Sequence, residues 1–347
     1  MIEIDGSHGE GGGALLRIAA ALSAVTGKPI KVNNIRSKRP KPGLMAQHLN
    51  ALKSVAQLSS ASYEGLEMAS TEIIFKPHEL DGGEYNIDIK TAGSTTLVLQ
   101  SFLIPAAFTK KPVKLTLRGG TDVRWSPPFD YLANVTQPIL RSLGLNMEME
   151  LIQRGYYPKG GGIIEVHIDP VKRIKPFNLS DLKVDRIRGI SHAVKLPEHV
   201  AIRQARAARD LLEEHGYHAD IEVQHSNTGL GPGSGIVLWT EAEETSPEGR
   251  NNSRIGGSSL GKPGKKAEIV GEEASLDIIN VIKHKSALDR YMGDQIIPYM
   301  ALAGNSRIKT AELTQHTLTN IYVAEKITGR KFEVTGELNN PALLTVD

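Results

Sequence analysis

The chain has 347 residues, of which 40% are hydrophobic and 23% charged, so it reads as a globular protein long enough for two domains or for one with an insertion. It contains no cysteine, which excludes thiol catalysis, disulfide bonds and thiolate metal sites. A net charge of +2 excludes a basic coat over the whole surface, so a nucleotide or nucleic-acid site must be a local patch. The sequence shows neither a long apolar run nor a secretory signal, which predicts a cytoplasmic protein without membrane contact.

The N-terminal sequence predicts a strand over residues 2–5, a glycine-rich loop over 6–13 and a helix over 14–25. This order is typical of a loop that holds phosphate groups, because glycine lets backbone N–H groups approach an anion closely. The loop matches neither a Walker A motif nor a dinucleotide fingerprint, so a simple tight turn remains an alternative. Two charged residues favour phosphate binding: Arg17 offers a bidentate contact, and Glu10 can hold a divalent cation.

A second candidate phosphate-binding segment lies at residues 36–43, which contain four cations, two prolines and a glycine. A charge run is often only a solvated surface. Here a backbone stiffened by proline would hold Arg36 and Arg39 in fixed positions, which suits a polyphosphate. Gln47 lies at the start of the next predicted helix.

Internal similarity indicates a repeated unit. The segment at 26–32 recurs at 109–115 and, more faintly, at 328–334, each time after an apolar helical run and before a predicted strand. We therefore expect an α/β (α+β) fold in which a unit of helices layered on a sheet occurs three times. In the second copy, a loop of small residues at 91–96 leads into a helix that carries Gln100.

One stretch of the chain lacks the repeat. Residues 182–284 read as a β-α-β-β-α pattern that contains a low-complexity loop over 241–264. This predicts a small α/β domain inserted into the large repeat domain, which would comprise residues 1–181 and 285–347. The second part of the large domain would then carry the C-terminal candidate residues.

Two further loops carry cations and aromatic residues. Residues 119–128 include Arg124 and Trp125. Residues 154–162 form a third glycine loop, with two cations and two tyrosines. A hairpin explains the glycines, whereas the cations and aromatic rings would suit combined phosphate and base contacts.

The strongest catalytic candidate lies near the C-terminus. His316 lies in a polar turn over residues 314–320 that passes into a segment with helical character, where helix N–H groups can bind an anion. We hypothesise that Asp294 accepts the Nδ1–H of His316, which leaves Nε2 free to attack. The chain has eleven histidines, so an ordinary surface or core role for this one is the alternative.

With these segments in order, the sequence resembles the RNA 3′-terminal phosphate cyclase family. The matching motifs occur in the family's order along nearly the whole chain, which is more specific than any single motif. They are Gly9-Glu10-Gly11-Gly12-Gly13 with Leu16-Arg17, Ile35-Arg36 with Arg39-Pro40-Lys41-Pro42-Gly43-Leu44 and Gln47-His48, Thr91-Ala92-Gly93-Ser94 with Leu97-Val98-Leu99-Gln100, Tyr157-Pro158 with Gly160-Gly161-Gly162, Tyr291 with Asp294-Gln295, and His316 with Leu318-Thr319-Asn320.

The resemblance implies a large domain of three βαβαββ-like units, a small inserted α/β domain, and an ATP-dependent ligase activity. In that reaction a histidine attacks the α-phosphate of ATP, releases pyrophosphate and becomes histidyl–AMP. AMP then passes to the 3′-phosphate of RNA, and the vicinal 2′-hydroxyl forms a 2′,3′-cyclic phosphodiester with release of AMP. The expected partners are therefore ATP, a divalent metal (Mg²⁺ or Mn²⁺) and RNA with a 3′-terminal phosphate.

The family's functional residues carry over by motif position. His316 would be the nucleophile, supported by Asp294, with Arg17 and Arg39 acting on the phosphates. The metal would be held by Glu10 and Gln100. The residues implied to bind the nucleotide are Glu10, Arg36, Gln47, Gln100, Pro127, Tyr291, Met292, Gly293, Asp294 and Gln295. The sequence departs from the family at Leu260, where cyclases place an aromatic residue against adenine, so Tyr291 would stack on the base with Pro127 as the other support.

Two alternatives accompany this interpretation. A non-catalytic ribosome-assembly factor forms a sister branch that lacks the histidine, and the presence of His316 with Tyr291 and Asp294 argues against it. An enolpyruvyl transferase is also built from repeated α/β units, but it would need no covalent histidine. If the chain forms a homo-oligomer, no disulfide can link the subunits.

Overall fold

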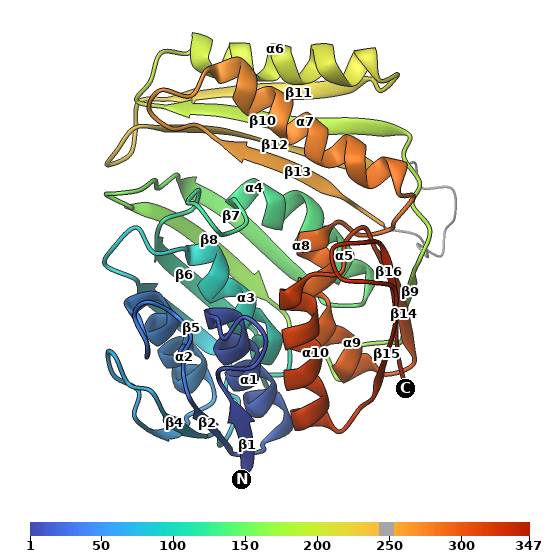
Figure 1. The fold of residues 1–347 in the computed structure, drawn as a ribbon. Helices are drawn as coiled ribbons and strands as arrows, with labels where there is room; N and C mark the ends of the chain where they lie inside the picture. Colours follow the sequence, from blue (N-terminus) through green and yellow to red (C-terminus); the bar gives the residue numbers. More distant parts are fainter. Residues whose placement is uncertain (243–252) are drawn as a thin grey trace.

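A computed structural model describes residues 1–242 and 253–347 of the chain. These residues form four four-stranded sheets, each with both parallel and antiparallel pairs, together with helices (Figure 1). The predicted α/β (α+β) class is therefore confirmed. Within the same ranges, no helix has both the length and the apolar character needed to cross a membrane.

Three of the sheets belong to three successive units. The first unit contains β1 (Ile2–Asp5), α1 (Gly13–Thr26), β2 (Ile30–Asn33), α2 (Ala46–Leu58), β3 (Ser62–Glu64) and β4 (Ile73–Lys76). The second contains β5 (Gly83–Asp88), α3 (Thr95–Ala106), β6 (Val113–Gly119), α4 (Phe129–Tyr131), a π-helical turn (Leu132–Thr136), α5 (Gln137–Ser142), β7 (Met147–Gln153) and β8 (Gly162–Ile168). The third contains β9 (Asn178–Leu179), α8 (Arg290–Gln295), α9 (Ile297–Ala303), β14 (Ser306–Thr310), α10 (Gln315–Thr328), β15 (Phe332–Thr335) and β16 (Ala342–Val346).

The three units share one strand connectivity. In each, the first strand pairs in parallel with the second, the second pairs antiparallel with the fourth, and the third lies at the edge, giving the orders β1-β2-β4-β3, β5-β6-β8-β7 and β9-β14-β16-β15. A parallel pair requires a crossover connection, which contains α1 in the first unit and α3 in the second. In the third unit the crossover also contains the insertion. The predicted threefold repeat is therefore confirmed.

The third sequence copy, however, does not lie at the equivalent junction. Segments 26–32 and 109–115 lead from the first helix of a unit to its second strand, whereas 328–334 leads from α10 to the third strand, β15. The similarity of 328–334 to the other two segments comes from the way the helices end. Helices α1 and α10 both have a C-cap glycine in the left-handed region, Gly27 at φ 66° and Gly329 at φ 84°. A shared C-cap explains the third copy better than the repeat does.

The insertion contains β10 (Arg186–Val194), α6 (His199–Glu214), β11 (Ala219–Ser226), β12 (Gly233–Glu241), β13 (Gly256–Leu260) and α7 (Ala267–Lys283). Strand β13 corrects the prediction of a loop over residues 241–264, of which 243–252 lie outside the described residues. Its glycines and serines have a low strand preference, but β13 pairs antiparallel with β12. A Cβ at Gly257 would lie 2.2 Å from the carbonyl oxygen of Ala274, so glycine lets α7 approach the sheet.

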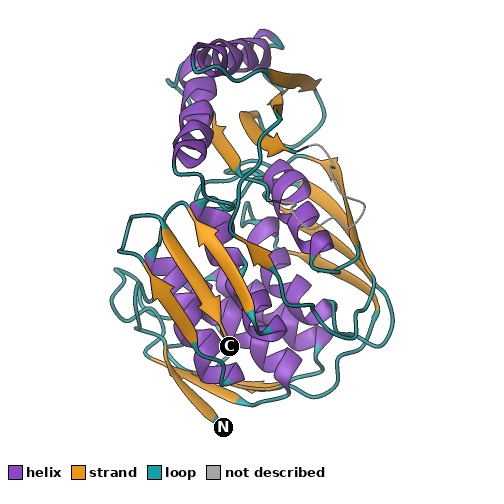
Figure 2. Cartoon of the chain, turned by 90° about the vertical axis from the view of Figure 1, so that its right-hand side faces the viewer, coloured by secondary structure: helices purple, strands orange, loops and turns teal. Residues whose placement is uncertain are grey.

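The three units together form one large body, in which the helices lie inside and the sheets lie outside. Helix α1 packs against α2, α3 and α10 in the centre, and the three sheets surround these helices (Figures 1 and 2). The insertion sits at one end of the body (Figure 1). One face of its sheet packs on α6 and α7, whereas Val237 and Trp239 on the other face join the core of the body. The domain limits at 181/182 and 284/285 stay a prediction.

Candidate active site

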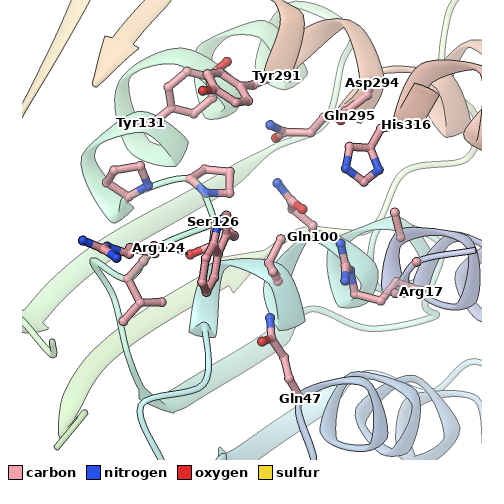
Figure 3. Close-up of a pocket in the computed structure, with 18 of the residues that line it drawn as sticks. Arg17, Gln47, Gln100, Arg124, Ser126, Tyr131, Tyr291, Asp294, Gln295 and His316 are labelled. Carbon is pink, nitrogen blue, oxygen red and sulfur yellow. Dashed lines mark hydrogen bonds between the residues drawn. The ribbon is translucent and has the colours of Figure 1, made fainter. Parts of the chain in front are cut away.

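A cleft of about 1050 Å³ lies where the body meets the insertion. Its lining comes from the N-terminal ends of α1 and α10, the basic loop after β2, the loop after β6, helix α8 and strand β13. It brings together most of the residues that the sequence singled out, namely Glu10, Arg17, Arg36, Arg39, Gln47, Gln100, Pro127, Leu260, Tyr291, Asp294, Gln295 and His316. Figure 3 shows Gln100 near the centre of this group, with Gln295 and His316 on one side and Gln47 on the other.

The glycine loop that precedes α1 is held against α10. The ring of His8 stacks on that of Tyr322, with centroids 3.8 Å apart. Gly9 has φ +57°, and a Cβ there would lie 2.3 Å from Oγ1 of Thr319, so both its backbone conformation and its close approach require glycine. These contacts place the N-termini of two helices at one cleft, where their backbone N–H groups favour an anion.

His316 lies in the first turn of α10, as the sequence predicted. Thr314 caps the helix by accepting a hydrogen bond from the backbone N–H of Thr317 at 3.0 Å. The carboxylate beside His316 is Glu10, whose Oε2 lies 3.3 Å from the histidine Nε2. The same oxygen lies 3.3 Å from a guanidinium nitrogen of Arg39. Glu10 therefore joins the histidine to a cation of the basic loop.

The hypothesis that Asp294 accepts the Nδ1–H of His316 is not met in this geometry. Within the described residues, no hydrogen bond joins the two side chains, and Asp294 instead interacts electrostatically with Arg17. Spacing along the chain could not distinguish the carboxylates, because Glu10 comes from the opposite end of the sequence. Asp294 still lies in the cleft near His316 (Figure 3).

Burial sets the protonation of the groups at this end of the cleft. It lowers the pKa of His316 below its ordinary value, with the carboxylate of Glu10 opposing and Arg17 and Arg39 adding to the effect. Burial also lowers the pKa of Arg17 to about 10 and raises the pKa of Asp294 to about 8. A neutral imidazole thus lies beside a partly desolvated cation, an arrangement that suits a nucleophile attacking an anionic phosphate.

The basic loop takes a defined conformation. Arg36 has φ +53° and donates hydrogen bonds to the backbone carbonyls of Lys41, at 2.9 Å, and Gly43, at 3.2 Å. The guanidinium of Arg36 therefore stabilises the closed loop and also lines the cleft. Arg39, in the same loop, donates a hydrogen bond to the carboxylate of Glu10. Nearby, burial and the charges of Arg17 and Arg36 lower the pKa of His48 to about 4, so this histidine is neutral.

The opposite end of the cleft has an aromatic character. Tyr291, at the start of α8, packs edge-on against Tyr131 with ring centroids 6.1 Å apart. Pro127 and Leu260 line the same cleft. Arg290 donates a hydrogen bond to the hydroxyl of Tyr291 at 2.7 Å, which fixes the phenol ring. A flat apolar surface with one polar edge is suited to a nucleobase.

Asp289, which none of the sequence motifs singles out, positions Tyr291. The buried carboxylate caps α8 by accepting from the backbone N–H groups of Tyr291 and Met292, both at 2.9 Å. It also accepts from the Tyr131 hydroxyl at 2.8 Å and from the backbone N–H of Gly256 in β13 at 2.8 Å. One side chain thus ties α8 to the body and to the insertion. The sequence signal for this role is an aspartate directly before a predicted helix, since aspartate is a preferred N-cap residue.

Two predicted nucleotide contacts do not line the cleft. Met292 is fully buried in the core of the body, and a Cβ at Gly293 would lie 2.3 Å from Oγ1 of Thr310 in β14, so this side of α8 is packed. The contact of these two residues with the nucleotide stays a prediction from the sequence. Tyr291, Asp294 and Gln295 face the cleft at the i, i+3, i+4 spacing of one helix face, whereas Met292 and Gly293 lie on the packed side of α8.

The third glycine loop is also not part of the cleft. Arg154 is buried and pairs with Asp130 at 2.8 Å and Asp122 at 3.4 Å. It donates a further hydrogen bond to Gln224 of β11 at 3.0 Å, while the hydroxyl of Tyr156 lies 2.8 Å from Nδ1 of His192 in β10. These side chains join the body to the insertion instead of binding phosphate and base.

This buried cluster does not fit a metal ion. Asp122, Asp130 and His192 have ligand atoms within 4.8 Å of one another. Arg154 already supplies a positive charge between the carboxylates. Although burial opposes the effect, this charge lowers the pKa of Asp122 below its usual range. In the cleft, by contrast, the side-chain oxygens of Glu10 and Gln100 are the ligand type that Mg²⁺ and Mn²⁺ prefer.

The cleft therefore combines a neutral histidine at a helix N-terminus, a cluster of cations and an aromatic base-sized surface, which is the composition of a nucleotidyl-transfer site. Comparison with known proteins defines it further. The chain belongs to the RNA 3′-terminal phosphate cyclase family, whose model matches residues 8–334.

Curated relatives match over essentially their whole length. The chain is 49% identical over 346 residues to the RNA 3′-terminal phosphate cyclase of Methanothermobacter thermautotrophicus, covering 100% of both chains. It is 49% identical over 339 residues to that of Pyrococcus furiosus, covering 97% of this chain and 96% of the relative. It is 46% identical over 353 residues to that of Methanopyrus kandleri, covering 100% of this chain and 98% of the relative.

Proposed function

We propose that this chain is an ATP-dependent RNA 3′-terminal phosphate cyclase in which His316 is the nucleophile. The observation that carries the proposal is the position of His316. It lies in the first turn of α10, 3.3 Å from Glu10, in a cleft that also contains Arg17 and Arg39. Since the family match covers nearly the whole chain, we do not retain the enolpyruvyl-transfer alternative.

In the first step, a nitrogen of neutral His316 attacks the α-phosphorus of ATP, the bond to the bridging oxygen breaks, and pyrophosphate leaves. Arg17 and Arg39 would stabilise the negative charge that develops on the phosphates, together with the N–H groups at the start of α1 and α10. Glu10 and Gln100 would hold the divalent cation, which neutralises charge on the polyphosphate when bound. Asp294 would lie near the ribose or the histidine.

The second and third steps use the RNA end. Its 3′-phosphate oxygen attacks the histidyl phosphorus, which frees His316 and forms RNA-(3′)pp(5′)A. The neighbouring 2′-hydroxyl then attacks the RNA phosphorus, forming the 2′,3′-cyclic phosphodiester while AMP leaves. Because that hydroxyl is already adjacent, the ring closure gains an effective-molarity advantage of roughly 7–11 kcal/mol where alignment is good.

The adenine would stack on Tyr291, with Pro127 and Leu260 as apolar neighbours and Gln295 at its edge. Leucine offers less stacking energy than an aromatic ring, so we expect only moderate discrimination among nucleobases. The prediction of a homo-oligomer without disulfides and that of a cytoplasmic location remain predictions from the sequence.

The direct test is the conversion of an oligoribonucleotide with a 3′-phosphate in the presence of ATP and Mg²⁺. We expect a product whose terminal phosphate resists phosphatase. The matched control is the same oligonucleotide with a 2′-deoxy terminal ribose, which should stop at the adenylated RNA. A 3′-phosphate that stays sensitive to phosphatase, with the protein folded, would contradict the proposal.

Replacement of Arg39 by alanine should weaken the use of ATP more than the binding of RNA, because Arg39 reaches the cleft beside Glu10. We expect a loss of about tenfold or more in the rate of self-adenylation at low ATP, in line with a lost charge-assisted phosphate contact. Arg36→Ala should act in the same direction while also loosening the loop that its side chain closes. Equal losses in ATP use and RNA affinity would assign the loop to RNA.

The rate of self-adenylation should depend on pH in a bell-shaped manner. Because burial lowers the pKa of His316 below 6.5, the imidazole should be neutral at pH 7 and the rate should fall only at lower pH. Burial raises the pKa of Asp294 to about 8, so its ionisation above that pH adds a negative charge to the phosphate site and should slow the reaction. Asp294→Asn should remove the alkaline limb. An unchanged alkaline limb in that variant would refute this role.

A further inference from the structure

Trp125 has the exposure of a ligand contact rather than that of a structural residue. Its side chain is 94% exposed, although it lines the cleft. It makes no hydrogen bond or ring contact with the described residues. The only other tryptophan, Trp239, is 4% exposed and packs in the core. A large flat ring that lies at a cleft without a partner in the described part of the chain is free to stack on a ligand.

The backbone of Trp125 adds an independent observation. Its φ is +62°, in the left-handed region that a bulky side chain rarely adopts. Such strain persists only where the surroundings impose it, and it concentrates at functional sites. Trp125 thus combines a rare backbone conformation with an exposed side chain in the lining of the cleft.

The loop around Trp125 is fixed on both sides. Ser126 donates a hydrogen bond to the carbonyl of Val123 at 2.9 Å, and Thr96 donates one to the carbonyl of Pro127 at 2.8 Å. On the N-terminal side, the backbone N–H of Thr121 donates to the carbonyl of Gly155 at 2.9 Å. The exposed indole is therefore presented by an anchored loop, which reduces the entropy lost when a ligand stacks on it.

We propose that Trp125 binds the RNA acceptor by stacking on a base at or near its 3′ end. This inference rests on the proposed function and deepens it. ATP can be enclosed in the cleft between Tyr291 and His316, whereas an RNA strand must leave the cleft past its rim. Arg124 next to Trp125 is exposed as well, and an aromatic ring beside a cation is the usual means of holding single-stranded nucleic acid.

Fluorescence offers a readout that does not depend on cyclisation. Because Trp239 is buried, a change in intrinsic emission on adding RNA reports mainly on Trp125. We expect a 3′-phosphorylated oligoribonucleotide, without ATP, to quench the emission of the wild type, and Trp125→Phe to abolish the quenching. ATP alone should have little effect. Quenching by ATP equal to that by RNA would move Trp125 to the nucleotide site and overturn the inference.

Kinetics of three variants complete the test. Trp125→Asn suits the left-handed backbone but cannot stack, so it should raise the KM for RNA by about tenfold or more, with self-adenylation unchanged and the thermal midpoint not lowered. Trp125→Phe should retain most of the RNA affinity. The control Tyr63→Ala, which removes an exposed aromatic ring from β3, should change nothing. An unchanged KM for RNA in Trp125→Asn would overturn the inference, whereas a wild type that forms no cyclic product would refute the proposed function instead.

Discussion

Replacement of His316 by alanine should abolish covalent labelling of the protein by α-³²P-ATP while leaving the fold intact. The imidazole is half-buried at the start of α10 and makes no contact on which the helix depends, because Thr314 provides the cap. Losing the nucleophile removes the only route to a protein-bound adenylate, so we expect at least a thousandfold loss of labelling. Gel electrophoresis of the labelled protein measures it.

The control for this variant is His167→Ala, which removes an exposed histidine of β8 that pairs with Asp169. It should label like the wild type. Retained labelling of His316→Ala would show that another residue is the nucleophile. Loss of labelling in both variants would point to a general effect of the substitutions instead of a catalytic one.

Replacement of Arg154 by methionine should destabilise the protein by about 3–5 kcal/mol, because it leaves two buried carboxylates without their counter-charge. Asp122 and Asp130 both pair with this guanidinium, whose side chain is only 7% exposed. The lower free energy of unfolding should appear as a lower midpoint of denaturation by guanidinium chloride. The insertion should also loosen from the body, since Arg154 bonds Gln224 across that junction.

The matched control is Arg206→Ala, which removes an exposed arginine from α6 that pairs with Asp210 one turn further on. A surface pair of this kind contributes about 0.3–0.5 kcal/mol, so the unfolding midpoint should hardly move. If Arg154→Met were no more destabilising than this control, the buried cluster would not hold the two parts together.

The sequence predicted the repeat, the insertion and most of the cleft because those features have local signals. Glycine-rich loops before helices, prolines around cations and a polar turn before α10 can each be read within about ten residues. Helix-ending turns also recur for their own reasons, which is why the segment at 328–334 is similar to the other two copies although it leads into the third strand of its unit.

The errors concern contacts between distant segments. Nothing near His316 indicates that Glu10 and not Asp294 would reach it. Nothing in the loop at 154–162 indicates that its arginine is buried against two aspartates, since a cation in a glycine loop looks the same whether it binds phosphate or a carboxylate. The strand β13 was missed because its stability comes from β12 and α7 rather than from its own residues.

The most direct test of the account is a pulse and chase with the wild-type protein. The protein is labelled with α-³²P-ATP and a divalent metal, freed of nucleotide and then given RNA with a 3′-phosphate. We expect an acid-labile, alkali-stable adenylate on the protein, which disappears on adding RNA as free AMP and cyclic ends form in equal amounts. The absence of a label under any divalent metal, with the protein folded, or a label that persists in the presence of RNA, would contradict the account.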